Sequence, residues 1–294
     1  METAPVVVGV DGSAAGLDAV AVAAREAKLR GCGLRVVHAF LWPAFGAYPG
    51  SASMLPGDTG LREEAEKAVA DAVAHARRAE PSVTAHGAVV TGEVTQVLVE
   101  ETRTAQLAVV AGRGLGTFTR LLVGSTAVHL SAYGHCPVLV VRAGGRHPGG
   151  PVLLAVDGSP AGAGAVDFAF AEAARRDVGL VALHVWSAWT RYSRRPDDSG
   201  RAAADGPAAE GDRVLAEAVA GAEKTYPGVR VERTAVEGSA RELLIEASRD
   251  AGLLVTGARG RGGFTGLLLG SVSHALLQHA HCPVAVVRGA GEHT

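Results

Sequence analysis

The feature that most constrains this chain is an internal repeat with an offset of 146 residues, as from Asp11 to Asp157. The stretch His135-Cys-Pro-Val recurs as His281-Cys-Pro-Val, and the two halves align without a net insertion. A period of this length is typical of a duplicated domain, because solenoid units repeat every ~20–50 residues. We therefore expect two copies of one domain, residues 1–145 and 146–294. The Gly- and Pro-rich segment 143–150 is the expected linker.

The composition fits two such domains. A chain of 294 residues has room for about two. Apolar residues make up 48% of the chain but aromatic residues only 4%, so the cores must consist mainly of Val, Leu and Ala. This composition favours buried parallel strands covered by Ala-rich helices.

Charge and hydropathy exclude several classes of protein. The net charge is −2 and no Lys/Arg block dominates, so non-specific nucleic-acid binding has little electrostatic basis. No apolar run approaches the ~18–20 residues that span a bilayer, and the N-terminus lacks the basic start of a signal peptide. Of the three cysteines, Cys136 and Cys282 are repeat equivalents, so we expect no disulfide framework and a cytoplasmic protein.

The first half alternates strand and helix patterns. We expect strands at 6–10, 34–40, 83–90, 107–111 and 137–142, and helices at 14–30, 61–80, 93–104 and 125–133. A Pro/Gly-rich loop is expected at 42–60. This order predicts an α/β fold with a parallel sheet and helices on both faces. Ligands of such sheets bind beyond the carboxyl ends of the strands.

Two loops fall at that edge of the sheet. One is Asp-Gly-Ser after the first strand of each half, beginning at Asp11 and Asp157. The other is a glycine-rich loop after the fourth strand, which leads into helices at Ser125 and Ser271. Unpaired backbone amides at such a loop and helix start suit an anion, most naturally a phosphate. If the first and fourth strands are neighbours, the two loops face each other across one nucleotide site.

Other interpretations of these residues stay open. The loop is not a P-loop, since Gly-Lys-Ser/Thr is absent, nor a dinucleotide fingerprint, which would follow the first strand. For Asp11 and Asp157 we favour ligand contact over catalysis, with helix capping as the structural alternative. Arg113 and Arg259 could neutralise phosphates or be solvated loop charges.

The His-Cys pairs hint at a metal, which we do not favour. Zinc sites normally need four ligands that are separated along the chain, and the cluster His279, His281 and Cys282 is not repeated, because Tyr133 replaces its first histidine. A structural role for the cysteines, as small buried apolar residues, is the preferred hypothesis.

Taken together, these motifs resemble those of a known family, the tandem universal stress proteins. The resemblance covers residues 5–142 and 151–288. It rests on the Val-Asp-Gly-Ser strand end, a His-containing second strand, a Gly-x2-Gly-x9-Gly-Ser loop and a final Cys-Pro-Val strand. It implies a Rossmann-like fold of the HUP type: two open parallel five-stranded sheets, strand order 3-2-1-4-5, paired about a pseudo-twofold axis.

The family's glycine pattern marks the members that bind ATP. Carried over to the second half, the resemblance implies these contacts: Asp157, Gly158, Ser159, Val185, Gly257, Arg259, Gly260, Gly270, Ser271 and Val272. In the first half the matching positions are Asp11, Gly12, Ser13, Ala39, Ala111, Arg113, Gly114, Gly124, Ser125 and Thr126. The first site departs from the pattern, because Ala111 replaces the first motif glycine and its methyl group crowds a phosphate or forbids a positive φ.

The last strand of each half carries a separate prediction about assembly. Val138–Val141 and Val284–Val287 are short, apolar and late in their halves, so we expect them at sheet edges. Because an open edge invites pairing, we expect the two halves to pair through these strands. A homodimer of the whole chain is left open.

The leading functional hypothesis is therefore an adenine-nucleotide-binding protein with ATP as its ligand, with or without Mg²⁺. The resemblance implies a regulatory, non-catalytic role in the stress response. One alternative is a slow ATPase or nucleotidyl transferase, which would need metal ligands and a base near the γ-phosphate. Another is a scaffold with vestigial pockets, which Ala111 favours for the first half.

Overall fold

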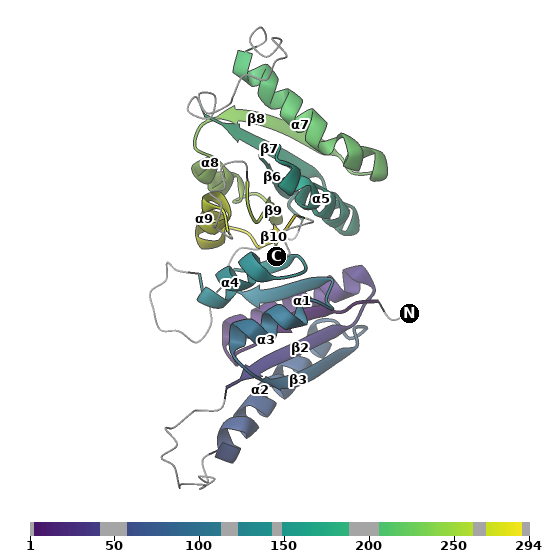
Figure 1. The fold of residues 1–294 in the computed structure, drawn as a ribbon. Coiled ribbons are helices and arrows are strands. Elements are labelled where there is room, and N and C mark those ends of the chain that lie inside the picture. Colours follow the sequence, from purple (N-terminus) through teal and green to yellow (C-terminus); the bar gives the residue numbers. More distant parts are fainter. Residues whose placement is uncertain are drawn as a thin grey trace, which may run out of the picture. The chain divides into compact units, whose positions relative to one another are not determined.

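The computed structural model describes residues 3–41, 58–112, 123–142, 149–187, 206–260 and 269–289. The chain divides into two compact units, Met1–Ala143 and Gly144–Thr294, each holding one copy of the repeat (Figure 1). The boundary expected between residues 145 and 146 falls outside the described ranges.

The first unit contains one five-stranded sheet. Its strands are β1 (Val6–Gly9), β2 (Leu34–Phe40), β3 (Ala85–Thr91), β4 (Leu107–Ala111) and β5 (Val138–Val141). They lie in the order β3-β2-β1-β4-β5, and each neighbouring pair is parallel. Because β1 and β4 are neighbours, the loops that follow them leave the same edge of the sheet side by side.

Four helices cover this sheet. They are α1 (Ala14–Arg30), α2 (Asp58–Ala79), α3 (Val94–Glu101) and α4 (Ser125–Tyr133). α1 packs against α2 and against β1 and β4, whereas α3 packs against α4 and against β2. From β1 to β3 the chain moves toward one edge of the sheet, and from β3 to β5 it moves toward the other edge. Because parallel crossovers are right-handed, α1 and α2 lie on one face of the sheet and α3 and α4 on the opposite face.

The second unit repeats this architecture. Its strands are β6 (Val152–Val156), β7 (Leu180–Trp186), β8 (Val231–Glu237), β9 (Leu253–Gly257) and β10 (Val284–Val287). They lie in the order β8-β7-β6-β9-β10, again all parallel. Its helices are α5 (Ala163–Arg176), α7 (Gly206–Thr225), α8 (Ala240–Ala247) and α9 (Ser271–His279), with a 3-10 turn, η1 (Pro160–Gly162), before α5.

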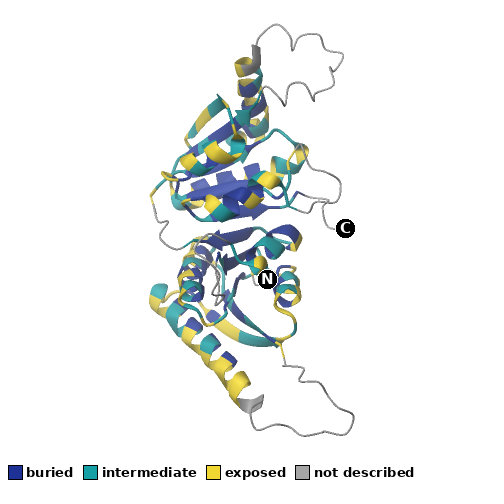
Figure 2. Cartoon of the chain, turned by 90° about the vertical axis from the view of Figure 1, so that its left-hand side faces the viewer, coloured by how far each residue is buried: buried dark blue, intermediate teal, exposed yellow. Residues whose placement is uncertain are grey.

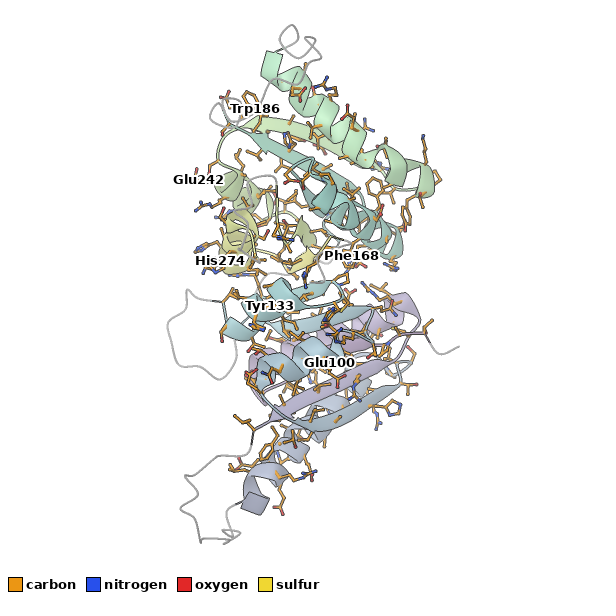
Figure 3. The ribbon with its side chains drawn as sticks, in the orientation of Figure 1. Glu100, Tyr133, Phe168, Trp186, Glu242 and His274 are labelled. Atoms are coloured by element: carbon orange, nitrogen blue, oxygen red, sulfur yellow. The ribbon has the colours of Figure 1, made fainter. Side chains whose placement is uncertain are left out.

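Small and branched apolar side chains form the two cores, as the composition predicts. Strands β1, β4, β5, β6, β9 and β10 are mostly buried, whereas β3 and β8 carry exposed and intermediate positions. Buried, intermediate and exposed residues alternate over the chain in Figure 2. Phe170 is the largest fully buried side chain. Glu100 on α3 and Glu242 on α8 are exposed, as are Tyr133 at the end of α4 and His274 on α9 (Figure 3).

Several expected boundaries were wrong by a few residues. The expected helix 93–104 ends at Glu101, because the Thr102 hydroxyl donates to the Val99 carbonyl (2.5 Å) and closes the last turn. The loop expected at 42–60 ends earlier, since α2 begins at Asp58; residues 42–57 lie outside the described part. The third strand is Ala85–Thr91, not 83–90, and the first and last strands are shorter than expected.

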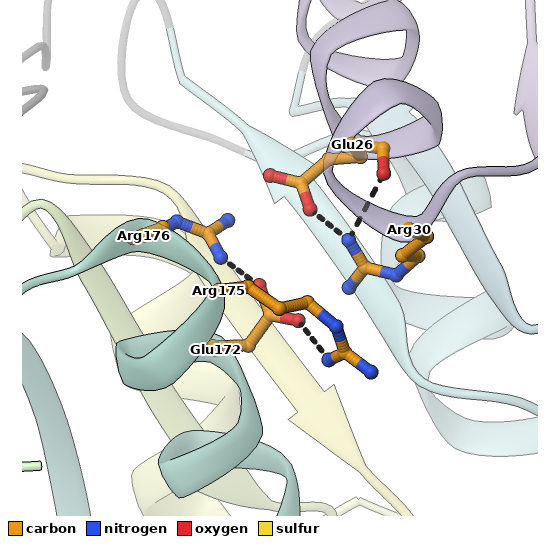
Figure 4. A network of polar contacts seen from close by, with 5 residues as sticks. All are labelled: Glu26, Arg30, Glu172, Arg175 and Arg176. Carbon is orange, nitrogen blue, oxygen red and sulfur yellow. Dashed lines mark hydrogen bonds and ion pairs between the residues drawn. The ribbon is translucent and has the colours of Figure 1, made fainter. Parts of the chain in front are cut away.

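Each unit also holds a buried acid and arginine on the helix after its first strand. Glu26 pairs with Arg30, and at the equivalent positions Glu172 pairs with Arg176 (Figure 4). Glu172 additionally accepts a hydrogen bond from Arg175 at 3.0 Å. Glu26 and Glu172 are among the few buried charged residues in the described chain, so each needs such a partner.

Candidate functional site

The Asp-Gly-Ser turn has the same geometry in both units. Gly12 and Gly158 adopt φ values of 80° and 69°, in the left-handed region that favours glycine. Ser13 donates its backbone N–H to Oδ1 of Asp11 (3.0 Å), and Ser159 does the same to Asp157 (2.9 Å). The aspartate therefore holds the turn at the end of the central strand. The alternative that Asp11 caps α1 is wrong, because Ser13 is the N-cap.

The base of the glycine-rich loop is also closed in the same way in both units. The Gly124 amide donates to the Gly112 carbonyl, and the Gly270 amide to the Ala258 carbonyl, each at 2.8 Å. These bonds bring together the two ends of the loop, so that the helix after it begins next to the strand before it.

The helices that follow begin with uncapped amides. The N-caps of α4 and α9 are Gly124 and Gly270, which offer no side chain. The backbone amides of Ser125, Thr126, Ser271 and Val272 make no hydrogen bond within the described chain. Ser125 and Ser271 are exposed. Such amides at the positive end of a helix favour an anion.

In the second unit the two loops face each other. A β-carbon placed on Gly260 would lie 2.6 Å from Oδ2 of Asp157. One placed on Gly162, in η1, would lie 3.4 Å from Oδ1 of the same side chain. The glycine loop therefore approaches Asp157 so closely that a side chain at position 260 would displace the carboxylate. In the first unit the matching Gly114 lies outside the described residues.

The second strand of each unit extends past the first. The last paired residues are Gly9 with Val37 in the first unit and Val156 with His184 in the second. Ala39 and Val185 thus lie beyond the end of the central strand and flank the Asp-Gly-Ser turn. This is where the resemblance places the edge of a base.

The expected departure at Ala111 has a structural counterpart. Ala111 ends β4 as Gly257 ends β9. A β-carbon on Gly257 would lie 3.1 Å from the Arg259 carbonyl oxygen, so the loop would have to move by a few tenths of an ångström. Arg259 is half-buried, and Arg113 falls outside the described residues.

Two site features escaped the sequence analysis. Gly16 and Gly162 are repeat equivalents, and a side chain on either would press on the turn aspartate, at 3.1 Å and 3.4 Å respectively. Ser273, in the first turn of α9, donates its hydroxyl to the Gly257 carbonyl (2.7 Å). The repeat offered a signal for the glycine, which is kept in the two halves, but none for Ser273, whose equivalent is Ala127.

The His-Cys-Pro turns show structural roles. The His135 amide donates to Oγ1 of Thr102, and the His281 amide to Oγ of Ser248, each at 2.8 Å. Burial raises the pKa of the Cys136 thiol to about 12. Across the described ranges, no three His, Cys, Asp or Glu side chains gather as potential metal ligands. A search of the same residues found no helix long and apolar enough to cross a bilayer.

Fold and site together define a class: a duplicated, doubly wound parallel α/β protein with loops converging at the switch point of each sheet. The model of the universal stress protein family matches residues 3–142 and 150–288. The chain belongs to the universal stress protein family and carries two of its domains.

Similar proteins agree with this assignment. A universal stress protein of Mycolicibacterium smegmatis is 39% identical over 303 residues, with 96% of each chain covered. Universal stress protein Rv2623 of Mycobacterium tuberculosis is 38% identical over 296 residues, again with 96% of each chain covered. The crystal structure of a universal stress protein from Archaeoglobus fulgidus has the same fold, with a TM-score of 0.71, 19% identity and 98% coverage of both chains.

Proposed function

We propose that this protein binds an adenine nucleotide, ATP, at the carboxyl edge of each sheet. The observation that carries this proposal is the approach of Gly260 to Asp157, where an added β-carbon would lie 2.6 Å from the carboxylate. It places the glycine loop opposite the turn aspartate, as a ligand that bridges the two loops requires. Ala39 and Val185, past the ends of β1 and β6, are the proposed contacts for the base edge.

The residues present suit a triphosphate. The amides of Ser271 and Val272 have no partner within the described chain and stand at the positive end of α9. A β-carbon on Gly257 would press on the Arg259 carbonyl oxygen (3.1 Å), and one on Gly260 on Oδ2 of Asp157 (2.6 Å), so both positions favour glycine. The ligand would carry Mg²⁺, where present, on its own phosphate oxygens.

We further propose a regulatory role without turnover, in the stress response and in the cytoplasm. Asp157 supports the absence of turnover, because its Oδ1 accepts hydrogen bonds from both the amide and the hydroxyl of Ser159 (2.9 and 2.8 Å). A carboxylate used in this way fixes a turn and is poorly suited to act as a general base. ATP turnover above background that disappears in Asp157→Asn, with binding retained, would revive the slow ATPase alternative.

The two units also share an edge feature. β5 ends the first sheet and β10 the second, and each presents four apolar residues. We propose that Val138–Val141 and Val284–Val287 pair with each other within one chain, because an unpaired apolar edge favours association.

Binding can be tested by thermal unfolding with and without ATP. A hundredfold excess of ATP over Kd should stabilise the folded state by ~2.7 kcal/mol for each occupied site, since the ligand binds only the folded state. Gly260→Ala should weaken ATP binding about tenfold or more, because its methyl group meets a carboxylate that Ser159 holds in place.

Gly221→Ala is the matched control, because a β-carbon there meets nothing within 4 Å. It should leave ATP affinity unchanged. An ATP-independent melting temperature in the wild-type protein, with no nucleotide in its native mass spectrum, would contradict the proposal and favour the scaffold alternative.

A further inference from the structure

The two units differ in the hydrogen bonds that hold their described site residues. In the second unit, Ser273 is buried and its hydroxyl donates to the Gly257 carbonyl (2.7 Å). This bond ties the first turn of α9 to the end of β9, at the point where the glycine loop departs. It therefore fixes the direction of the exposed amides of that turn. In the first unit the equivalent residue is Ala127, which has no hydroxyl.

A second bond holds the strand end that precedes Asp157. His184, in β7, is buried, and its Nδ1 lies 2.7 Å from the Val156 carbonyl oxygen. A carbonyl can only accept, so the tautomer with the proton on Nδ1 is the one that makes this bond. Val156 is the residue directly before Asp157, so the imidazole fixes the base of the turn.

The equivalent histidine of the first unit makes no such bond. Nδ1 of His38 is buried and has no hydrogen-bond partner in the described chain. The contrast is informative because His38 and His184 occupy the same repeat position. The residue type has been retained in both halves, but only the second half uses it to hold the strand end.

The Asp-Gly-Ser turn shows a third difference. In the first unit the Ser13 hydroxyl accepts a hydrogen bond from the Gly16 amide and caps α1 (3.0 Å). In the second unit Pro160 follows Ser159, a 3-10 turn replaces the capped start, and the Ser159 hydroxyl donates to Oδ1 of Asp157 (2.8 Å). The Ser13 hydroxyl therefore caps a helix, whereas the equivalent Ser159 hydroxyl holds the aspartate side chain.

From these three differences we propose that Ser273, His184 and Ser159 are positioning residues that make the second-half site the tighter of two unequal nucleotide sites. This inference rests on the proposed function and assigns residues outside the glycine motif. All three act by holding Gly257, Val156 and Asp157 in the binding geometry before the ligand arrives. Preorganisation of this kind lowers the cost of ordering on binding.

The test measures ATP affinity of the full chain by calorimetry, in an Asp11→Ala background that weakens the first site. Ser273→Ala, which copies the first half, should raise Kd about three- to tenfold, the effect of one neutral hydrogen bond. His184→Leu should do the same. His184→Asn should restore near-parental affinity, because the Asn amide nitrogen can replace Nδ1 as the donor.

His38→Leu is the matched control and should leave this affinity unchanged. Unliganded melting temperatures are recorded for every variant, to separate lost stability from lost positioning. The inference is overturned if Ser273→Ala and His184→Leu bind ATP like the parent. It is also overturned if His184→Asn binds as weakly as His184→Leu. A parent chain that binds no ATP at all would instead refute the proposed function, on which this inference depends.

Discussion

At the scale of single residues, burial decides the chemistry of the Cys-Pro turn. Burial raises the pKa of the Cys136 thiol from 9.0 to about 12, and Cys282, its repeat equivalent, is fully buried. Both are free thiols. A thiol that keeps its proton is a poor nucleophile, so this position behaves as an apolar core residue. Because of this pKa shift, the contribution of Cys136 to the free energy of unfolding depends on pH.

We predict that Cys136 makes the folded chain less stable at alkaline pH. Below pH 9 the thiol is protonated in both states and its contribution is fully present. Between pH 9 and about 12 the unfolded chain releases this proton while the folded chain retains it, so the free energy of unfolding falls as pH rises. Denaturant titrations at pH 8, 9 and 10 should show a steeper decline in the wild-type protein than in Cys136→Ala. Equal slopes would contradict the shift.

Single residues also show how far sequence reasoning about the site reached, although the site itself stays a prediction. The motif predicted Asp157 and Gly260 as site residues, and the structure brings these two together. Neither Ser273 nor the partner of His184 could be found in this way, because both bonds depend on the fold placing α9 over the end of β9 and β7 beside β6. No local pattern encodes such a bond between segments distant in sequence.

At the scale of elements, one hydroxyl joins a helix end to a distant turn in each unit. Thr102 and Ser248 are buried, and each donates to a carbonyl of the preceding helix and accepts from the amide of His135 or His281. The expectation that α3 continues to residue 104 overlooked this role, since threonine at a helix end satisfies the last turn and also binds outside it.

We predict that Thr102→Val lowers the free energy of unfolding by about 1–3 kcal/mol. The shape is retained, but the part-buried His135 amide loses the hydroxyl that accepts its hydrogen bond, while the Val99 carbonyl keeps only the Thr102 amide as a donor. An unsatisfied buried group costs about that much. Chemical denaturation monitored by circular dichroism measures the change. Thr95→Val is the comparison, because Thr95 lies on the same helix and its hydroxyl contacts only the exposed Glu93. Equal stability of the two variants would contradict the role given to Thr102.

Several elements were predicted to the residue, among them α1, β2, β4 and α4. Their ends carry strong local signals, such as Ser13 before α1, Gly31 after it and Gly124 before α4. The second unit departs from its twin at η1, where Pro160 replaces an alanine and the Ser159 hydroxyl bonds Asp157 and does not cap the helix. Local sequence therefore predicts where a helix or strand begins and ends more readily than which hydrogen bonds fix its ends.

At the scale of the whole molecule, the repeat predicted the architecture most reliably. One half contains every alternation of strand and helix, and the second half supplies an independent copy of the same pattern. The strand order β3-β2-β1-β4-β5 was expected only through the family resemblance, since periodicity alone does not order strands in a sheet. Pairing of the two halves stays a prediction.

Hydrogen–deuterium exchange on the intact chain tests that pairing. Each sheet has two edge strands in its own unit, β3 and β5 in the first, β8 and β10 in the second. If β5 and β10 pair, we predict that peptides covering 138–141 and 284–287 exchange far more slowly than those covering the other edges, 85–91 and 231–237. Their amides would then all belong to a continuous ladder. Similar exchange at all four edges would contradict pairing through these strands.

The unequal bracing of the two halves has a consequence for a fused pair. A homodimer of single domains carries the same gene product twice, so any change to one pocket changes the other. In a fused chain a serine can enter at position 273 while position 127 keeps alanine, and each pocket acquires its own affinity. If the two affinities differ, the binding curve of the chain is broadened. Such a protein responds over a wider span of ligand concentration than two identical pockets allow.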